Sequence, residues 1–153
     1  MTIRVLDQRI SSLMRDFYPT AIRISFAVIF VWFGALKPLG LSAAEPLVLN
    51  TVAWMPFLEP QVWLAIIGFW EIGIGLFFIS LRTTRLAILL LFLQMSGTFL
   101  PLFILPEVTF QPGGIPFLPT IEGQYIIKNL MILSAALVLG SLVRQSDLKR
   151  KVS

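Results

Sequence analysis

The chain contains no cysteine and no histidine, and only 13% of its 153 residues are charged. Without those two residue types it has no disulfide, no thiol relay, no Cys- or His-based metal site and no His-ligated haem of its own. A catalytic redox centre carried by this polypeptide alone is therefore not expected. The scarcity of charge also argues against a soluble domain, because so short a chain cannot bury the apolar surface of a sequence that is 57% hydrophobic.

Long apolar runs dominate the sequence instead. Four of them reach the roughly 20 residues needed to cross about 30 Å of hydrocarbon. They cover approximately Pro19–Leu36, Gln61–Leu81, Thr84–Leu105 and Gly123–Val143. The sequence thus predicts an all-α membrane protein, with one four-helix transmembrane domain over residues 1–153. The first run is too long for a cleavable signal peptide, so we expect the first crossing to act as the insertion signal.

Basic residues gather on one side of this predicted topology. Ten of the twelve precede or begin the first crossing, lie in the tight second connection, or lie in the tail. These ten are Arg4, Arg9, Arg15, Arg23, Arg82, Arg85, Arg144, Lys149, Arg150 and Lys151. The positive-inside rule then places both termini in the cytoplasm, with residues 144–153 as a basic tail. The net charge of +4 reflects this bias and does not indicate nucleic-acid binding.

The segment before the first crossing has its own pattern. Residues 1–18 carry apolar side chains at helical spacing, with Arg, Asp, Gln and Ser between them. This pattern predicts an amphipathic helix on the cytoplasmic surface that ends at Tyr18-Pro19. A solvated tail whose residues alternate by chance is the alternative. Arg23, just inside the first crossing, is expected to extend to the membrane interface.

Both outer connections are expected to cover the bundle. Residues 38–60 are too apolar for an aqueous loop and predict a short interfacial helix capped by Ser42, with Trp54 and Trp63 at the headgroup level. Gln111–Gly114 predicts a type II turn within a small hairpin-like lid, and Thr120 offers a cap for the last crossing.

Glu71 is the most informative residue, since it lies halfway along the second apolar run. A charge at the bilayer centre costs roughly 2.5–17 kcal/mol, so it is seldom left without a partner. Gly68, Glu71, Gly75 and Ile79 share one helical face, which is small and polar, whereas the other faces carry Phe, Ile and Leu. Glu71 is therefore predicted to point into the bundle.

Depth along the helices suggests which polar groups meet Glu71. At about 1.5 Å per residue, Gln94 lies at nearly the same depth and Lys128 lies about 7 Å nearer the outer face, within reach of a lysine stem. We expect Glu71, Lys128, Asn129 and Gln94 to form one buried polar cluster that opens outward, with Lys37 at its rim. Such a cluster suits a lipid headgroup or quinone carbonyl, a proton-transferring carboxylate, or an ion pair that only fixes helix register.

Four sequence motifs resemble one known family. They occur in the same order in the YkgB-like branch of the DoxX-like membrane proteins: Trp32–Lys37, Glu45–Val48, Trp70–Gly75 and Glu122–Asn129. The resemblance implies a four-helix bundle in a bacterial inner membrane. It also maps the family's polar positions onto Arg23, Lys37, Glu45, Glu71 and Lys128. Relatives in the wider group are linked to quinone-coupled oxidation of sulfur compounds or to oxidative-stress complexes.

Together these observations predict a non-catalytic accessory subunit, or a small lipid- or quinone-binding module, of a membrane assembly that is redox-linked. We expect membrane lipids and a protein partner or a second copy as its contacts, and no nucleic acid. One alternative is a DoxX-type quinone-reducing subunit that works with a soluble catalytic protein. Another is a small proton-coupled transporter, although four crossings without an inverted repeat are few for that class.

Overall fold

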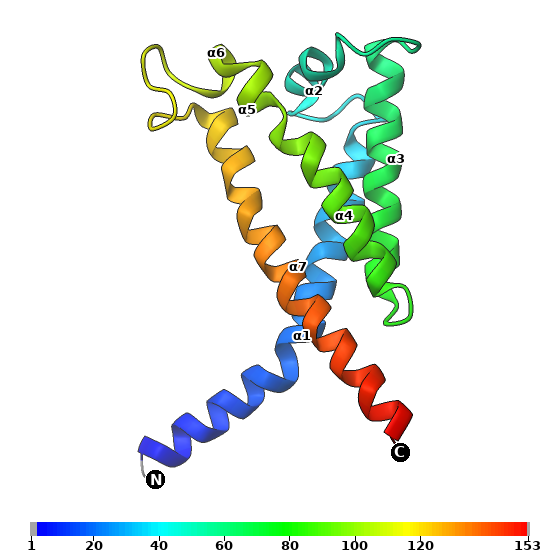
Figure 1. The fold of residues 1–153 in the computed structure, drawn as a ribbon, viewed down its shortest axis with the longest axis vertical. Coiled ribbons are helices and arrows are strands. Elements are labelled where there is room, and N and C mark those ends of the chain that lie inside the picture. Colours follow the sequence, from blue (N-terminus) through cyan, green and yellow to red (C-terminus); the bar gives the residue numbers. More distant parts are fainter. Residues whose placement is uncertain (1–2, 153) are drawn as a thin grey trace.

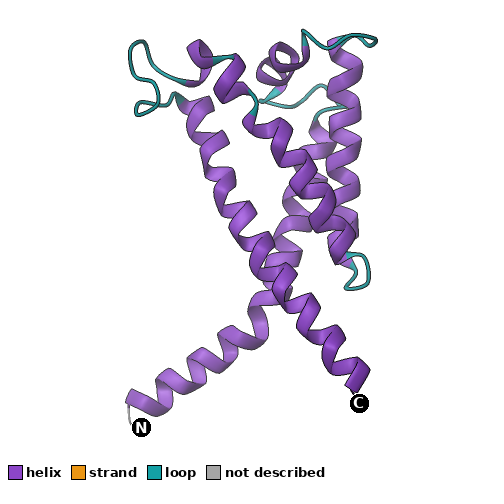
Figure 2. Cartoon of the chain, viewed as in Figure 1, coloured by secondary structure: helices purple, strands orange, loops and turns teal. Residues whose placement is uncertain are grey.

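The computed structural model describes the backbone of residues 3–152 and the side chains of residues 3–142. Within those residues every named element is a helix, and no β-strand is present (Figure 2). The elements are α1 (Ile3–Leu36), α2 (Glu45–Val52), α3 (Pro60–Ile79), α4 (Thr84–Phe99), α5 (Pro101–Ile104), α6 (Pro106–Thr109) and α7 (Ile121–Val152). The predicted all-α class is confirmed.

Four helical stretches are long and apolar enough to cross a membrane, as the sequence predicted. They are Ile3–Leu36, Pro60–Ile79, Thr84–Ile104 and Ile121–Leu142. The third consists of α4 and α5, which follow one another directly. Both chain ends lie at one end of the bundle, beyond the turn that joins α3 to α4, and α2, α5 and α6 cover the opposite end (Figure 1). We call these the terminal end and the capped end.

The predicted helix end at Tyr18-Pro19 is wrong. Helix α1 runs for 34 residues with Pro19 in its interior. Proline removes one backbone hydrogen bond and bends a helix, but when both flanking turns are good helix formers it kinks the helix without ending it. Figure 1 shows α1 bending where it leaves the bundle. All residues from Ile3 to Phe17 are exposed, so this N-terminal arm does not pack against the bundle.

Glycines allow α1 and α3 to pack with their backbones in contact. A Cβ added to Gly34 would lie 2.8 Å from the carbonyl oxygen of Gly68, and one added to Gly75 would lie 2.8 Å from the backbone nitrogen of Val31. Real Cβ atoms do not approach backbone so closely, and small residues at such crossings are the usual means of close packing in membranes. The predicted inward stripe of α3 is confirmed at Gly68 and Gly75, whereas Ile79, at the end of that stripe, is 65% exposed.

The core lies where α1, α3, α4 and α7 converge. Its most buried large side chains include Phe78 on α3, Leu91 on α4 and Leu139 on α7, each 1% exposed or less. The rings of Phe26 and Phe78 pack with centroids 4.9 Å apart. Large apolar side chains also remain exposed around the outside, as expected for helices surrounded by lipid.

The capped end contains the predicted turn. Gly113 has φ +71°, and the backbone nitrogen of Gly114 donates to the carbonyl of Gln111 at 2.8 Å, as a type II turn requires. One antiparallel bridge, between Phe110 and Pro119, closes the loop, so the hairpin-like lid is present in its shortest form.

Of the two predicted N-terminal helix caps, the one at Thr120 is present and the one at Ser42 is not. Thr120 caps α7 as expected, because its hydroxyl accepts the backbone N–H of Gly123 at 3.2 Å. Ser42 does not cap α2. That helix begins at Glu45 with Ala44 as its N-cap, and the Ser42 hydroxyl accepts only the backbone N–H of Ala44, at 3.3 Å.

Candidate functional site: a buried ion pair joining three helices

Glu71 forms an ion pair with Lys37 inside the bundle. One carboxylate oxygen, Oε2, accepts a hydrogen bond from the Lys37 ammonium. The two side chains are 8% and 14% exposed, so both charges are largely shielded from the surroundings. Glu71 lies about 16 Å along α3 from its first residue, near the middle of that helix. Lys37 directly follows the last residue of α1, at the capped end.

Gln94 completes the cluster from α4. Its side-chain amide donates to the other carboxylate oxygen of Glu71, Oε1, at 3.0 Å. Its backbone carbonyl accepts from the Thr98 hydroxyl at 3.1 Å. Both oxygens of Glu71 thus have a donor, and a single carboxylate connects α1, α3 and α4. The sequence prediction that Glu71 and Gln94 meet at a similar depth is confirmed.

The local sequence explains why Lys37 is the partner. Gly34 and Gly68 bring the backbones of α1 and α3 together. A Cβ added to Gly68 would therefore lie only 2.9 Å from the Cβ of Lys37. Lys37 is therefore adjacent to α3 one helical turn from Glu71, and its stem runs along that helix. It belongs to the centre of the cluster, whereas the sequence placed it only at the rim.

Lys128 and Asn129 do not join the cluster, which corrects the sequence prediction. The Lys128 ammonium lies 5.2 Å from the centre of the Tyr125 ring, on its own helix. The Asn129 side chain donates to the backbone carbonyl of Tyr125 at 3.2 Å. Residue counting gives depth but does not show which helices are neighbours. Helix α7 packs mainly on α4 and α6, and only slightly on α1.

Arg23 has a role that sequence reasoning missed. Its guanidinium donates to the carbonyl of Phe78 at 3.1 Å and to that of Ile79, the last two residues of α3. The final carbonyls of a helix lack partners within the helix, and a cation there also complements the helix dipole. The Thr83 hydroxyl donates to the carbonyl of Phe77 at 2.7 Å. The absence of a capping glycine after Ile79 was the signal that side chains would be needed.

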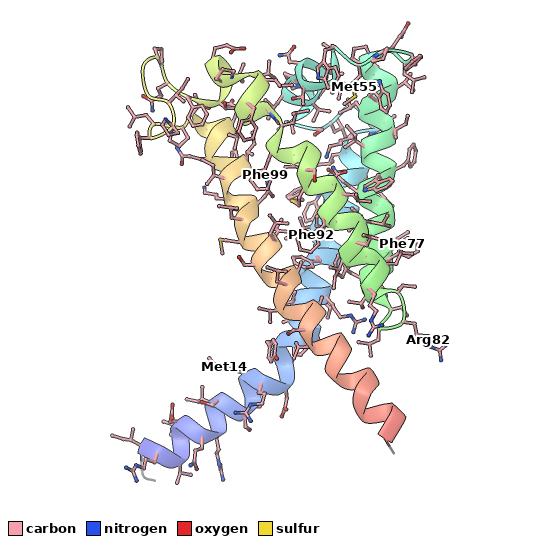
Figure 3. The ribbon with its side chains drawn as sticks, in the orientation of Figure 1. Met14, Met55, Phe77, Arg82, Phe92 and Phe99 are labelled. Atoms are coloured by element: carbon pink, nitrogen blue, oxygen red, sulfur yellow. The ribbon has the colours of Figure 1, made fainter. Side chains whose placement is uncertain are left out.

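The two tryptophans assigned to the membrane interface differ. Trp54 is 63% exposed, and its headgroup contact stays a prediction. The indole nitrogen of Trp63 is enclosed by protein, and no described group accepts its hydrogen. It therefore does not point its N–H outward as an interfacial tryptophan would. Figure 3 shows Arg82 at the terminal-end turn, directed away from the bundle.

The cluster consists of an ammonium, a carboxylate and an amide. Among the described residues no group of three or more His, Cys, Asp or Glu could hold a metal ion. The three side chains present can donate to a carbonyl or phosphate oxygen, exchange a proton at the carboxylate, or fix the register of three helices. The basic tail, residues 144–153, has side chains outside the described residues.

Comparisons of the chain with models of known protein families, with curated proteins and with solved structures find no match. The resemblance to the YkgB-like branch of the DoxX-like proteins therefore stays a prediction from sequence motifs. What can be said of function comes from the geometry of the bundle.

Proposed function

We propose that the protein is a non-catalytic integral membrane module that binds the headgroup of a lipid or quinone at Lys37, Glu71 and Gln94. It would serve as an accessory subunit of a larger, redox-linked membrane assembly. The location that goes with this proposal is a bacterial inner membrane with both termini in the cytoplasm. In that arrangement α2 is an interfacial helix on the outer surface, and the N-terminal arm of α1 lies on the inner surface.

The observation that supports a ligand site is the unfilled hydrogen-bonding capacity of Lys37. An ammonium has three donors, and within residues 3–142 the acceptor of Lys37 is one oxygen of Glu71. A buried donor without an acceptor costs about 1–3 kcal/mol, and more when the group is charged. An acceptor oxygen on a ligand would recover that cost.

The charge of the cluster favours a neutral acceptor. Lys37 and Glu71 cancel, so an anion near the ammonium would also lie near the carboxylate and be repelled in a medium of low dielectric. A carbonyl oxygen of a quinone or of a lipid ester avoids this repulsion. The position of Lys37, next to the end of α1 at the capped end, would let such a headgroup enter from one leaflet.

A second candidate, a proton-coupled transporter, draws support from Glu71 itself. Its carboxylate touches side chains from two other helices, so a change in its protonation would alter contacts among three helices at once. The quinone-reducing alternative needs a soluble catalytic partner, because the chain offers no redox centre built on Cys or His.

The test is binding of a short-chain quinone to protein purified in mild detergent. Binding is measured by the quenching of the intrinsic tryptophan fluorescence. Lipids and quinones that copurify are identified in parallel by mass spectrometry. We expect saturable binding by the wild type and at least a ten-fold loss in Lys37→Met, or about 1.4 kcal/mol. Arg82→Gln removes an exposed positive charge at the terminal end and serves as the matched control.

A Lys37→Met variant that folds poorly would leave the result ambiguous, so the double variant Lys37→Met/Glu71→Gln is measured as well. It removes both charges and should keep the helices together while abolishing binding. Equal binding of quinone and carbonyl lipids by wild type and double variant would refute the site. Proton-driven solute flux in liposomes that contain the pure protein, and its loss in Glu71→Gln, would instead support the transporter.

A further inference from the structure

Lys128 is an exposed cation inside a membrane-spanning helix. It lies about 10 Å along α7 from Ile121, within the stretch that is long and apolar enough to cross a membrane. Among residues 3–142 the ion pair of the structure is Lys37–Glu71, so no described acid pairs with Lys128. Charged side chains within the span are rare and usually face a partner. The Tyr125 ring, 5.2 Å from the ammonium, only partly compensates for lost hydration.

The side of α7 that carries Lys128 changes character along the helix. Tyr125, Lys128, Ile132 and Leu139 follow one another at spacings of three, four and seven, so they share one side of the helix. Leu139 is 1% exposed and packs in the core, whereas Tyr125 is 66% exposed. This side is thus covered near the terminal end and uncovered toward the capped end.

The packing of α7 explains the change. Near the terminal end it lies against α4, where a Cβ on Gly140 would be 3.7 Å from the Ile88 side chain. Near the capped end it is held by α6, because the Thr120 hydroxyl donates to the Val108 carbonyl at 2.7 Å. In Figure 3, Phe92 and Phe99 of α4 lie between α4 and α7 in projection. Toward the capped end, Tyr125 and Lys128 remain exposed.

We propose that Lys128 binds the phosphate of a phospholipid from the leaflet at the capped end. The ammonium and the phosphate have opposite charge. A lysine stem extends about 6 Å toward the headgroups, which is most of the distance of about 10 Å between Lys128 and the first residue of α7. Tyr125, one turn nearer the surface, lies at the level where tyrosine rings meet headgroups. Met131, one turn deeper and 74% exposed, offers apolar surface to an acyl chain. Glu122 is six residues from Lys128, about 120° around the helix and one turn beyond Tyr125, so its carboxylate is not beside the ammonium.

The proposal is independent of the ligand site at Lys37, since Lys37 follows α1 and pairs with Glu71, whereas Lys128 lies on α7 against Tyr125. The ligand classes also differ. The Lys37–Glu71 pair is neutral as a unit and favours a neutral acceptor, whereas Lys128 has no acidic partner among the described residues and favours an anion. Loss of one site is expected to leave the other intact.

The experiment is a titration of delipidated protein in mild detergent with phosphatidylglycerol, with bound lipids counted by native mass spectrometry. Wild type should retain one lipid more tightly than the rest. Lys128→Met should bind that lipid about ten-fold more weakly, and Lys128→Arg should restore it. Arg82→Met is the matched control, because it removes an exposed cation from the terminal end. Excess inorganic phosphate should not displace the lipid, since it lacks acyl chains.

Several results would overturn the proposal. One is an unchanged lipid count and affinity in Lys128→Met. Another is an equal loss in Arg82→Met, which would mean that any positive charge suffices. A third is release of the lipid by inorganic phosphate alone. A fourth is a wild-type dimer that dissociates in Lys128→Met while lipid binding persists, since the occupant of this side of α7 would then be a second copy of the chain.

Discussion

A double-mutant cycle can identify the lysine that pairs with Glu71. The sequence predicted Lys128, whereas the structure pairs Glu71 with Lys37. The variants are Lys37→Met, Glu71→Gln and the pair combined, with Lys128→Met as the competing partner. In the structure the Lys37–Glu71 pair is 8% and 14% exposed, so water screens it little. Lys128 is exposed on another helix and lies against Tyr125. The two lysines therefore predict different couplings.

The size of the effect follows from two limits. Removing one partner of a buried ion pair costs about 3–5 kcal/mol in soluble proteins. Polar contacts inside membranes are worth about 0.6–1.7 kcal/mol, because the denatured chain in the membrane also finds partners. We expect about 2 kcal/mol for Lys37→Met. Glu71→Gln should cost somewhat less, because glutamine at position 71 still accepts a hydrogen bond from Gln94.

The double variant separates coupling from simple addition. Once both charges are gone, neither is left buried and unpaired, so the combined loss should be at least about 1 kcal/mol smaller than the sum of the single losses. Lys128→Met combined with Glu71→Gln should instead be additive within about 0.5 kcal/mol. The measurement is the free energy of unfolding in mixed micelles, titrated with a denaturing detergent. If the losses of Lys37→Met and Glu71→Gln simply add, while those of Lys128→Met and Glu71→Gln are coupled, the pairing of Lys37 with Glu71 is refuted. Lys128 would then be the partner of Glu71, as residue counting predicted.

Three further predictions concern packing, capping and topology. Gly75→Ala places a Cβ 2.9 Å from the Ala27 carbonyl and should destabilise the bundle by about 1–3 kcal/mol. The control Gly73→Ala meets nothing within 4 Å and should be neutral or slightly stabilising in a thermal melt. Equal shifts in melting temperature for the two variants would mean that the glycine stripe of α3 does not face α1. Arg23→Met removes the donors to the last carbonyls of α3 and should speed amide exchange in the last turn of α3 more than in α4; uniform exchange would contradict a capping role. Reporter fusions after Ser153 and at Gly113 should report opposite sides of the membrane, and the same side for both would overturn the four-crossing topology.

Properties that depend on one helix at a time could be read from the sequence. The four apolar runs correspond to four helices long and apolar enough to cross a membrane, because the length of such a run can be compared directly with bilayer thickness. The inward direction of Glu71 followed from its place between Gly68 and Gly75. The turn at Gln111–Gly114 followed from the need for a positive φ at Gly113. Each of these is a local property of the chain.

Properties that depend on the order of helices around the bundle could not be read in this way. Counting residues placed Lys128 within reach of Glu71, but α7 packs on α4 and α6 rather than on α3. The end predicted for the N-terminal amphipathic helix at Tyr18-Pro19 was also wrong, since Pro19 weakens a helix without deciding whether the neighbouring turns continue it. The cap that Arg23 provides joins residues 55 apart in sequence, so the missing glycine after Ile79 does not show which side chain caps α3.

Glycines carry the information that would have identified the correct lysine. A helix that lies backbone to backbone on another needs a glycine at the crossing, and the nearest long side chain then lies against the neighbour. Gly34 precedes Lys37 by one turn and opposes Gly68, so Lys37 is forced toward α3 and meets Glu71. The nearest glycine before Lys128 is Gly123, which packs on α6. Of the two lysines, Lys37 directly after α1 is therefore brought to Glu71 by the packing of the backbone, whereas Lys128 on α7 has no acidic partner among the described residues.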